Sequence, residues 1–144
     1  MNPFKLFLVG LALTVALGML LGTPGTAMAQ DAKLIKIHGV GGDALAGVFI
    51  DPETAYIKKD TIVVWLSGVK QEEIKVEFAD GKKCKSVTAF SVGFNIDKER
   101  WCYVTSYVPF AATSSLQFVD EGEYEYKVIS KSGKATAMGR LVVE

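Results

Sequence analysis

The feature that most constrains the fold is a two-residue alternation of apolar and polar side chains. It is clearest where Ile74, Val76 and Phe78 alternate with Lys75 and Glu77. Successive side chains of a β-strand point to opposite faces, so this spacing indicates a strand with one face in a hydrophobic core. No segment after residue 29 shows a sustained 3.6-residue apolar stripe. The sequence therefore predicts an all-β protein.

Turn-forming residues divide the chain into eight or nine short strands. Short strands at this spacing are typical of a two-sheet sandwich with Greek-key connections. The polar residues around 95–100 are expected to form a loop. The predicted strands are Leu34–His38, Val48–Ile50, Thr61–Leu66, Ile74–Phe78, Ser86–Phe90, Trp101–Val108, Ser115–Val119, Tyr124–Ile129 and Ala137–Val143.

Residues 1–29 have the pattern of a secretory signal peptide. Lys5 is their only charge, and an apolar run of 16 residues extends from Leu6 to Leu21. The small residues Ala27 and Ala29 then suit a signal-peptidase site. The alternative is an uncleaved anchor, because a span needs roughly 17 to 25 apolar residues and this run is nearly that long. The helix-breaking residues before the cleavage site favour removal, which leaves residues 30–144 as the mature domain.

The mature chain is close to neutral. Removing 29 of 144 residues leaves 115, a common size for one domain. It carries 15 basic and 16 acidic residues, so its net charge is about −1. This balance gives no electrostatic argument for binding nucleic acid or an anionic membrane. Membrane contact is expected only through the signal segment, if that segment is not cleaved.

Two cysteines, Cys84 and Cys102, lie in the mature chain. Exported proteins meet an oxidising compartment, where two thiols at a plausible separation usually pair. We therefore expect a Cys84–Cys102 disulfide, with two buried free thiols as the alternative. The bond would close a loop of 19 residues. In the chain-entropy model it stabilises the fold by about 3 kcal/mol.

Three stretches carry motifs in a fixed order. IDP at 50–52 and IKKDTIVVW at 57–65 combine a proline element with a turn into a tryptophan-bearing strand. VPFAATSSLQF follows at 108–118, and GEYEY at 122–126 is closed by MGRLVV at 138–143. Together they resemble the cupredoxin family, the small β-sandwiches that include plastocyanin and azurin. The resemblance implies a cupredoxin-like Greek-key sandwich, and copper electron transfer is the best-known chemistry of that family.

The sequence departs from this family at the copper ligands. A blue-copper site needs two imidazoles and one thiolate, with a weak axial thioether. The chain has one histidine, His38, on the first predicted strand. The resemblance places the ligand positions near Ile74, Val128, Gly133 and Met138, and only the methionine is a ligand type. Both cysteines lie outside the expected ligand loop. We therefore expect no copper and no other cofactor.

Several residues remain as weak candidates for a site. His38 could ligate a metal or act as a base, although a lone histidine at a strand end is more often structural. Met138 could be a relic axial ligand or part of a partner surface, but methionine fills irregular gaps well and core packing is the expectation.

Trp101, Tyr103, Tyr107 and Phe110 form the densest aromatic region and a candidate partner surface. Strand alternation would put Trp101, Tyr103 and Tyr107 on one face of the strand. That face could equally pack into the hydrophobic core.

These features favour a periplasmic or secreted cupredoxin-like domain that acts as a binding or interaction module of the cell envelope. Its partner would be an envelope or extracellular protein or ligand. The alternative is a periplasmic electron-transfer or copper-handling protein with an atypical site or one shared between chains. No catalytic signature is present, so the sequence does not predict an enzyme.

Overall fold

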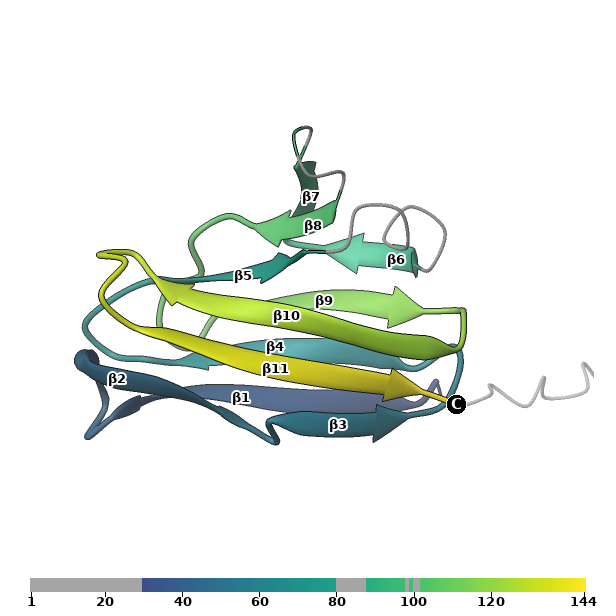
Figure 1. Cartoon of the computed structure of the whole chain (residues 1–144), viewed down its shortest axis with the longest axis horizontal. Coiled ribbons are helices and arrows are strands. Elements are labelled where there is room, and N and C mark those ends of the chain that lie inside the picture. The colour runs from purple at the N-terminus through teal and green to yellow at the C-terminus, as the bar shows by residue number, and fades with distance from the viewer. Residues whose placement is uncertain (1–29, 80–87, 98, 100–101) are drawn as a thin grey trace, which may run out of the picture.

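The computed structural model describes residues 30–79, 88–97, 99 and 102–144, which form two β-sheets packed face to face (Figure 1). The predicted signal segment, residues 1–29, lies outside the described residues. The described part of the chain contains no helix, and hence no helix there that could cross a membrane. The all-β, two-sheet architecture predicted from the alternation is confirmed.

Both sheets mix parallel and antiparallel strand pairs. β1 (Ala32–Val40) pairs with β4 (Ile62–Gly68) in parallel, as does β3 (Thr54–Ile57) with β11 (Thr136–Val143), and the other pairs are antiparallel. In sheet order, the five-stranded sheet contains β2 (Asp43–Asp51), β1 (Ala32–Val40), β4 (Ile62–Gly68), β9 (Thr113–Phe118) and β6 (Thr88–Val92). The six-stranded sheet contains β3 (Thr54–Ile57), β11 (Thr136–Val143), β10 (Gly122–Ser130), β5 (Ile74–Phe78), β8 (Cys102–Thr105) and β7 (Phe94–Asp97).

The prediction of a polar loop around residues 95–100 is wrong for residues 95–97, because these belong to strand β7, which begins at Phe94. This strand pairs with β8 from Phe94 opposite Thr105 to Asp97 opposite Cys102. It lies at the edge of the six-stranded sheet, and an edge strand can carry polar side chains that face water. Phe94 is 7% exposed and belongs to the core. Phe94 and Ile96 alternate with Asn95 and Asp97, but two apolar positions are too short a pattern to predict a strand.

The strand predicted over Trp101–Val108 is shorter than expected. β8 ends at Thr105, and Val108 makes only an isolated bridge to Ile74. Pro109 follows directly and has no backbone N–H with which to continue a ladder. The alternation that placed Tyr103 and Tyr107 on one face therefore does not extend to Tyr107.

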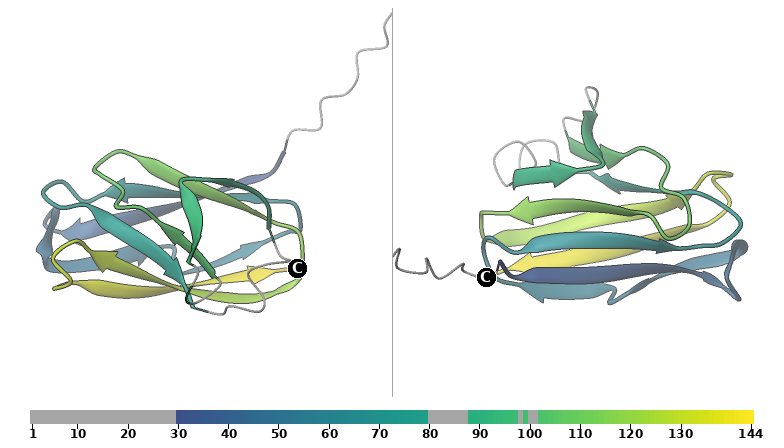
Figure 2. Two further views of the ribbon diagram at one scale, coloured as in Figure 1. Left: turned by 90° about the horizontal axis from the view of Figure 1, so that it is seen from above. Right: turned by 180° about the vertical axis from the view of Figure 1, so that it is seen from behind.

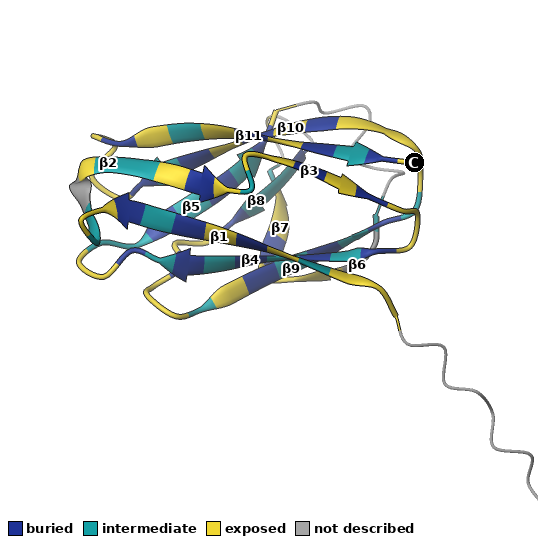
Figure 3. Cartoon of the chain, turned by 90° about the horizontal axis from the view of Figure 1, so that it is seen from below, coloured by how far each residue is buried: buried dark blue, intermediate teal, exposed yellow. Residues whose placement is uncertain are grey.

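Aromatic rings from both sheets meet in the core. Trp65 is the largest fully buried side chain among the described residues. The centroid of its ring lies 5.7 Å from that of Phe78, 5.3 Å from that of Phe94 and 5.6 Å from that of Tyr126, each in an edge-on arrangement. Such edge-to-face pairs are favoured by the aromatic quadrupole. Buried residues alternate with exposed or half-buried ones along the strands (Figure 3). The two-residue pattern of the sequence thus specifies which side chains enter this core.

Burial of Tyr126 predicts a loss of stability in alkali. Burial raises the pKa of its phenol to about 12; the nearby Trp65 acts in the opposite direction and Glu53 adds to the rise. An unfolded tyrosine ionises near pH 10, so folding favours the neutral phenol. The contribution of the neutral Tyr126 phenol to the free energy of unfolding is fully present below about pH 10 and is lost as pH rises toward 12.

Because this stabilisation is lost in alkali, we expect the free energy of unfolding to be about 2 kcal/mol lower at pH 11.5 than at pH 9. Urea unfolding of the parent and of Tyr126→Phe at both pH values isolates it. The variant should lose less stability than the parent over this interval. Parallel losses in the two proteins would contradict the assignment to Tyr126.

Candidate binding site

Three connecting segments meet at one end of the sandwich, the left end in Figure 1. They are residues 69–73 between β4 and β5, residues 106–112 between β8 and β9, and residues 131–135 between β10 and β11. We call this region the loop end. Because loops on a rigid β-scaffold are common places for binding residues, the loop end is the first region to consider.

Backbone hydrogen bonds hold the loop end together. Ile74 and Val108 exchange two bonds of 3.0 and 2.7 Å, which attach the 106–112 segment to the start of β5. The backbone N–H of Lys131 donates to the carbonyl of Glu73 at 2.9 Å. The N–H of Ala111 donates to the carbonyl of Ser67 at 2.8 Å. The three segments are therefore tied to strands of both sheets and are presented in a defined arrangement.

Tyr107 is an exposed aromatic ring between two lysines. Its side chain is 42% exposed, and the ring centroid lies 5.8 Å from Nζ of Lys75 and 5.6 Å from Nζ of Lys131. Both distances are within the usual range for a cation–π interaction. Two cations therefore lie near one ring that stays partly exposed to solvent.

Carboxylates from neighbouring segments neutralise these lysines. Nζ of Lys75 lies 2.5 Å from Glu77, and Nζ of Lys131 lies 2.5 Å from Glu73. The hydrogen bond from Lys131 to Glu73, together with the charge of that carboxylate, raises the pKa of Lys131. The lysines around Tyr107 thus form a paired and locally neutral surface, which suits a neutral partner better than an anionic one.

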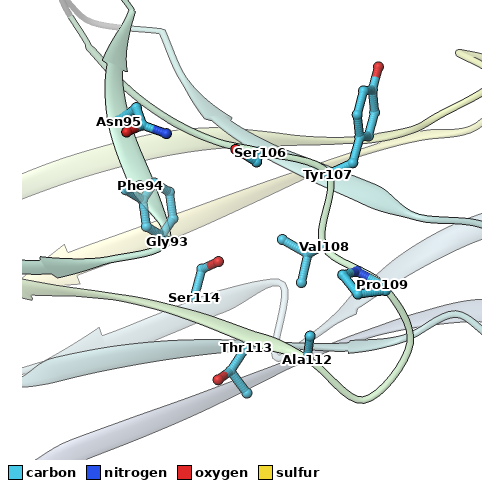
Figure 4. Close-up of a pocket in the computed structure, with 10 residues that line it drawn as sticks. All are labelled: Gly93, Phe94, Asn95, Ser106, Tyr107, Val108, Pro109, Ala112, Thr113 and Ser114. Atoms are coloured by element: carbon cyan, nitrogen blue, oxygen red, sulfur yellow. The ribbon is translucent and has the colours of Figure 1, made fainter.

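A pocket of about 280 Å³ lies between the 106–112 segment, β7 and β9 (Figure 4). Its polar groups are the amide of Asn95 and three hydroxyls, and its apolar walls include Phe94 and Val108. Figure 4 shows the ring of Tyr107 pointing away from the pocket. The lining residues are Gly93, Phe94, Asn95, Ser106, Tyr107, Val108, Pro109, Ala112, Thr113 and Ser114.

The pocket depends on a glycine between β6 and β7. Gly93 has a φ of 75°, in the left-handed region that side chains rarely adopt. A Cβ at this position would also lie 2.6 Å from Oγ of Ser114. Only glycine lets the chain turn from one sheet to the other this close to β9. Sequence reasoning missed Gly93 and Asn95, although a glycine immediately before an aromatic residue was an available signal.

The predicted aromatic surface is divided by the fold. Phe110 is 51% exposed at the loop end, like Tyr107. Tyr103 is half-buried against the core, and the hydroxyl of Thr88 donates a hydrogen bond to its phenol oxygen. Trp101 lies outside the described residues. Among the described members of the set, Tyr107 and Phe110 therefore carry the exposed aromatic area, and their role in partner binding stays a prediction.

Comparison with known proteins gives a match to solved structures alone. No family model and no curated protein matches the chain. A reduced amicyanin variant with a tryptophan-to-tyrosine substitution is 15% identical, with a TM-score of 0.51 over 81% of this chain and 85% of that chain. Amicyanin from Paracoccus versutus is 16% identical, with a TM-score of 0.49 over 79% of this chain and 82% of that chain.

The chain has the cupredoxin fold. The first match carries this conclusion together with the two-sheet topology, and at 15% identity it shows the fold alone. The resemblance of the sequence motifs to that family is thus confirmed at the level of the fold.

Three of the four positions at which the motif resemblance would place copper ligands hold residues that do not bind copper, and Met138 is the fourth. Ile74 and Val128 are buried at 1% and 0% exposure, and Gly133 lies in the β10–β11 turn with a φ of 73°. Within the described ranges, no three histidine, cysteine or acidic side chains are grouped so that they could hold a metal. With one histidine in the whole sequence, a mononuclear site with two imidazoles cannot form within a single chain.

The two weak metal candidates lie in different sheets. His38, on β1, is half-buried and its ring stacks on Phe49 at 5.0 Å. Met138, on β11, is 53% exposed, so the expectation that it packs in the core is wrong. The reason is register: Gly139 occupies the inward position opposite Tyr126, and Met138 therefore points outward opposite Lys127. There it lines a second pocket with Arg140 and other outer residues.

The Cys84–Cys102 disulfide remains a prediction, because Cys84 lies outside the described residues. Cys102 is 1% exposed at the start of β8. Titration of the denatured, unreduced protein with a thiol reagent should detect no reactive thiol, and reduction should release two. Two reactive thiols before reduction would contradict the bond.

Proposed function

We propose that this protein is an exported, non-enzymatic binding module of the cell envelope, located in the periplasm or secreted. The observation that carries the proposal is the loop end, where Tyr107 and Phe110 are exposed beside a neutral pocket of about 280 Å³. Rigid aromatic side chains supply large contact area at a low entropic cost. The partner is an envelope or extracellular protein or ligand, and neither nucleic acid nor a cofactor is required.

The residue types at the expected copper-ligand positions favour a binding function over electron transfer. Type 1 copper needs a thiolate and two imidazoles, whereas the corresponding positions carry aliphatic side chains and glycine. The lysines beside Tyr107 are paired with carboxylates, so the surface has little net charge. A cupredoxin fold that keeps its core but lacks these ligands acts through its surface, since function belongs to sites and not to folds.

Copper loading tests the redox alternative. The exported protein, incubated with Cu(II) and freed of unbound metal, is expected to retain no stoichiometric copper and to show no intense thiolate-to-copper band. One copper per chain with such a band would overturn the proposal. That result would favour the alternative hypothesis of an electron-transfer or copper-handling protein, with a site that is atypical or shared between chains.

Affinity capture from the native envelope fraction tests the binding surface. The parent protein should retain a partner that the double variant Tyr107→Ala/Phe110→Ala retains at least about tenfold less, as is typical when aromatic hot spots are removed. Tyr56→Ala is the matched control, because Tyr56 is an aromatic residue on β3 that is 67% exposed. Equal retention by all three proteins, or by none, would contradict the loop end as the binding surface.

A further inference from the structure

The pocket of Figure 4 lies where the chain crosses twice between the two sheets. β6 belongs to the five-stranded sheet and β7 to the six-stranded sheet, so the chain crosses at Gly93. Residues 106–112 make the return crossing from β8 to β9. The view from behind in Figure 2 shows β6 and β7, in green, at one edge of the sandwich. The two crossings frame the pocket, so its wall is built from both sheets.

Three polar side chains around this pocket have unused hydrogen-bonding capacity. They are the amide of Asn95 on β7, the hydroxyl of Ser106 after β8 and the hydroxyl of Ser114 on β9. Figure 4 shows the polar ends of Asn95 and Ser106 turned toward each other, and the hydroxyl of Ser114 pointing up from the other sheet. Within the described part of the chain, none of the three has a hydrogen-bond partner. One ligand in the pocket can therefore bond to all three.

Ser114 combines deep burial with an unpaired hydroxyl. It is 2% exposed, and a Cβ at Gly93 would lie 2.6 Å from its Oγ, so the hydroxyl lies directly beside the first crossing. Polar groups at this depth are almost always hydrogen-bonded to protein or to an ordered water. Because Ser114 lines the pocket, the partner of its hydroxyl has to come from whatever occupies the pocket, solvent or ligand.

The apolar wall of the pocket is held rigidly by the core. Phe94 and Val108 are each 7% exposed, and the ring centroid of Phe94 lies 5.3 Å from that of Trp65. The backbone of Val108 exchanges two hydrogen bonds with Ile74. A site that is already formed spends little binding free energy on ordering its own side chains. The three polar groups are therefore presented against a fixed apolar surface.

The described residues that line the pocket include no charged side chain. Burying a charged ligand group without a counter-charge is costly, so the lining favours a neutral ligand. Hydroxyl and amide groups both donate and accept hydrogen bonds, and they pair best with a ligand whose groups do the same. The volume of about 280 Å³ lies just below the usual range for small-molecule pockets, so the pocket accommodates a single ring.

We propose that this pocket binds one ring of a neutral carbohydrate. The ring hydroxyls bond to Asn95, Ser106 and Ser114, and the C–H groups of the ring pack against the apolar wall. A serine or threonine side chain from a protein partner would bring one hydroxyl, and an asparagine or glutamine one amide, so either leaves part of this set unpaired. Carbohydrate binding here rests on the proposed binding function and deepens it, because it names the ligand class that the pocket takes.

Titration of the exported protein with free glycosides tests the site. The probes are methyl β-glucoside, methyl β-galactoside, methyl α-mannoside and N-acetylglucosamine, followed by nitrogen–proton correlation spectra. At least one is expected to saturate with a dissociation constant of about 1 to 10 mM, because the affinity available per atom limits a single ring. The shifted signals should include the side-chain amide of Asn95 and the backbone amides of Ser106 and Ser114. Glycerol, a polyol without a ring, should bind at least about tenfold more weakly.

Two substitutions locate the bound sugar. Asn95→Ala and Ser114→Ala each remove one hydrogen-bonding group, and each should weaken binding at least about threefold. The double variant should weaken binding at least about tenfold. Ser115→Ala is the matched control, since it makes the same change at the next residue of β9, which does not line the pocket, and it should bind like the parent. Circular dichroism verifies that all the variants are folded.

Each other outcome overturns the carbohydrate site. A parent that binds none of the glycosides has no such site, and glycerol shifts as large as the glycoside shifts would reflect a general effect of polyols. Binding that survives in the double variant, or is equally weakened by Ser115→Ala, does not belong to the pocket. If the double variant loses a captured envelope partner while no glycoside binds the parent, the pocket takes a protein side chain and the proposed function stands without the sugar. If the parent binds neither partner nor glycoside, both proposals fail.

Discussion

Replacing Trp65 with alanine is expected to lower the free energy of unfolding by about 3 to 5 kcal/mol. The indole is 1% exposed and contacts the rings of Phe78, Phe94 and Tyr126. These rings come from three strands of the opposite sheet, so the alanine variant leaves a cavity at the junction of the two sheets. Neither sheet can collapse into that space without losing strand pairing.

Chemical denaturation of the oxidised protein measures this loss. Tyr56→Ala is the control, since it removes an aromatic ring that is 67% exposed and should change the free energy of unfolding by no more than about 0.5 kcal/mol. A domain of this size has roughly 5 to 15 kcal/mol in total, so the alanine variant approaches the limit of folding. Trp65→Phe keeps part of the ring volume and should lie between parent and alanine. A loss below about 1 kcal/mol for Trp65→Ala would contradict the central packing role.

The position of Trp65 illustrates how much of the fold the sequence predicts. Its strand was recognised from the β-branched run around it, and β5 was recognised with its bounds at Ile74 and Phe78. Both strands have one fully buried face; in β5 the charged residues Lys75 and Glu77 alternate with it, whereas β4 is a continuous apolar run from Ile62 to Leu66. Where burial is one-sided and the strand is central, residue pattern and structure agree closely.

Elements at the sheet edge were predicted less well. The β7 strand has Phe94 as its one buried residue, and the polar residues Asn95 and Asp97 around the exposed Ile96 are typical of a loop in sequence. Pairing with β8 decides that segment, and strand pairing is a tertiary contact that no local pattern encodes. The end of β8 at Thr105 is partly local, because Pro109 follows Val108 and cannot continue a ladder, but the isolated bridge between Val108 and Ile74 joins residues distant in the chain.

The candidate site was predicted in part. The aromatic residues Tyr107 and Phe110 were selected from composition, and both are exposed at the loop end. The pocket beside them also depends on Gly93 and Asn95, which approach through the turn between the two sheets. Met138 was misassigned to the core because its spacing from Tyr126 does not reveal which of two neighbours points inward. That choice is made by the register of β10 and β11.

The same register makes Gly139 one of the least replaceable residues, and Gly139→Val is expected to cost about 3 kcal/mol. Gly139 lies directly opposite Tyr126, and a Cβ at this position would come well within 3.0 Å of the phenol ring. The ring is 0% exposed and packs edge-on against Trp65 at 5.6 Å, so it has no free space to enter. The glycine of the closing motif and the second tyrosine of GEYEY are therefore two halves of one packing arrangement.

Denaturation in two backgrounds tests this coupling. Met138→Val, on the adjacent exposed position, is the control and should change the free energy of unfolding by no more than about 0.5 kcal/mol. In a Tyr126→Leu background, which removes the ring, Gly139→Val should cost at least about 1 kcal/mol less than in the parent. An equal cost in both backgrounds would show that the glycine is needed for its backbone. A reduced cost would show that contact between the introduced valine side chain and the Tyr126 ring causes much of the loss, which ties two separate sequence motifs to one point in the core.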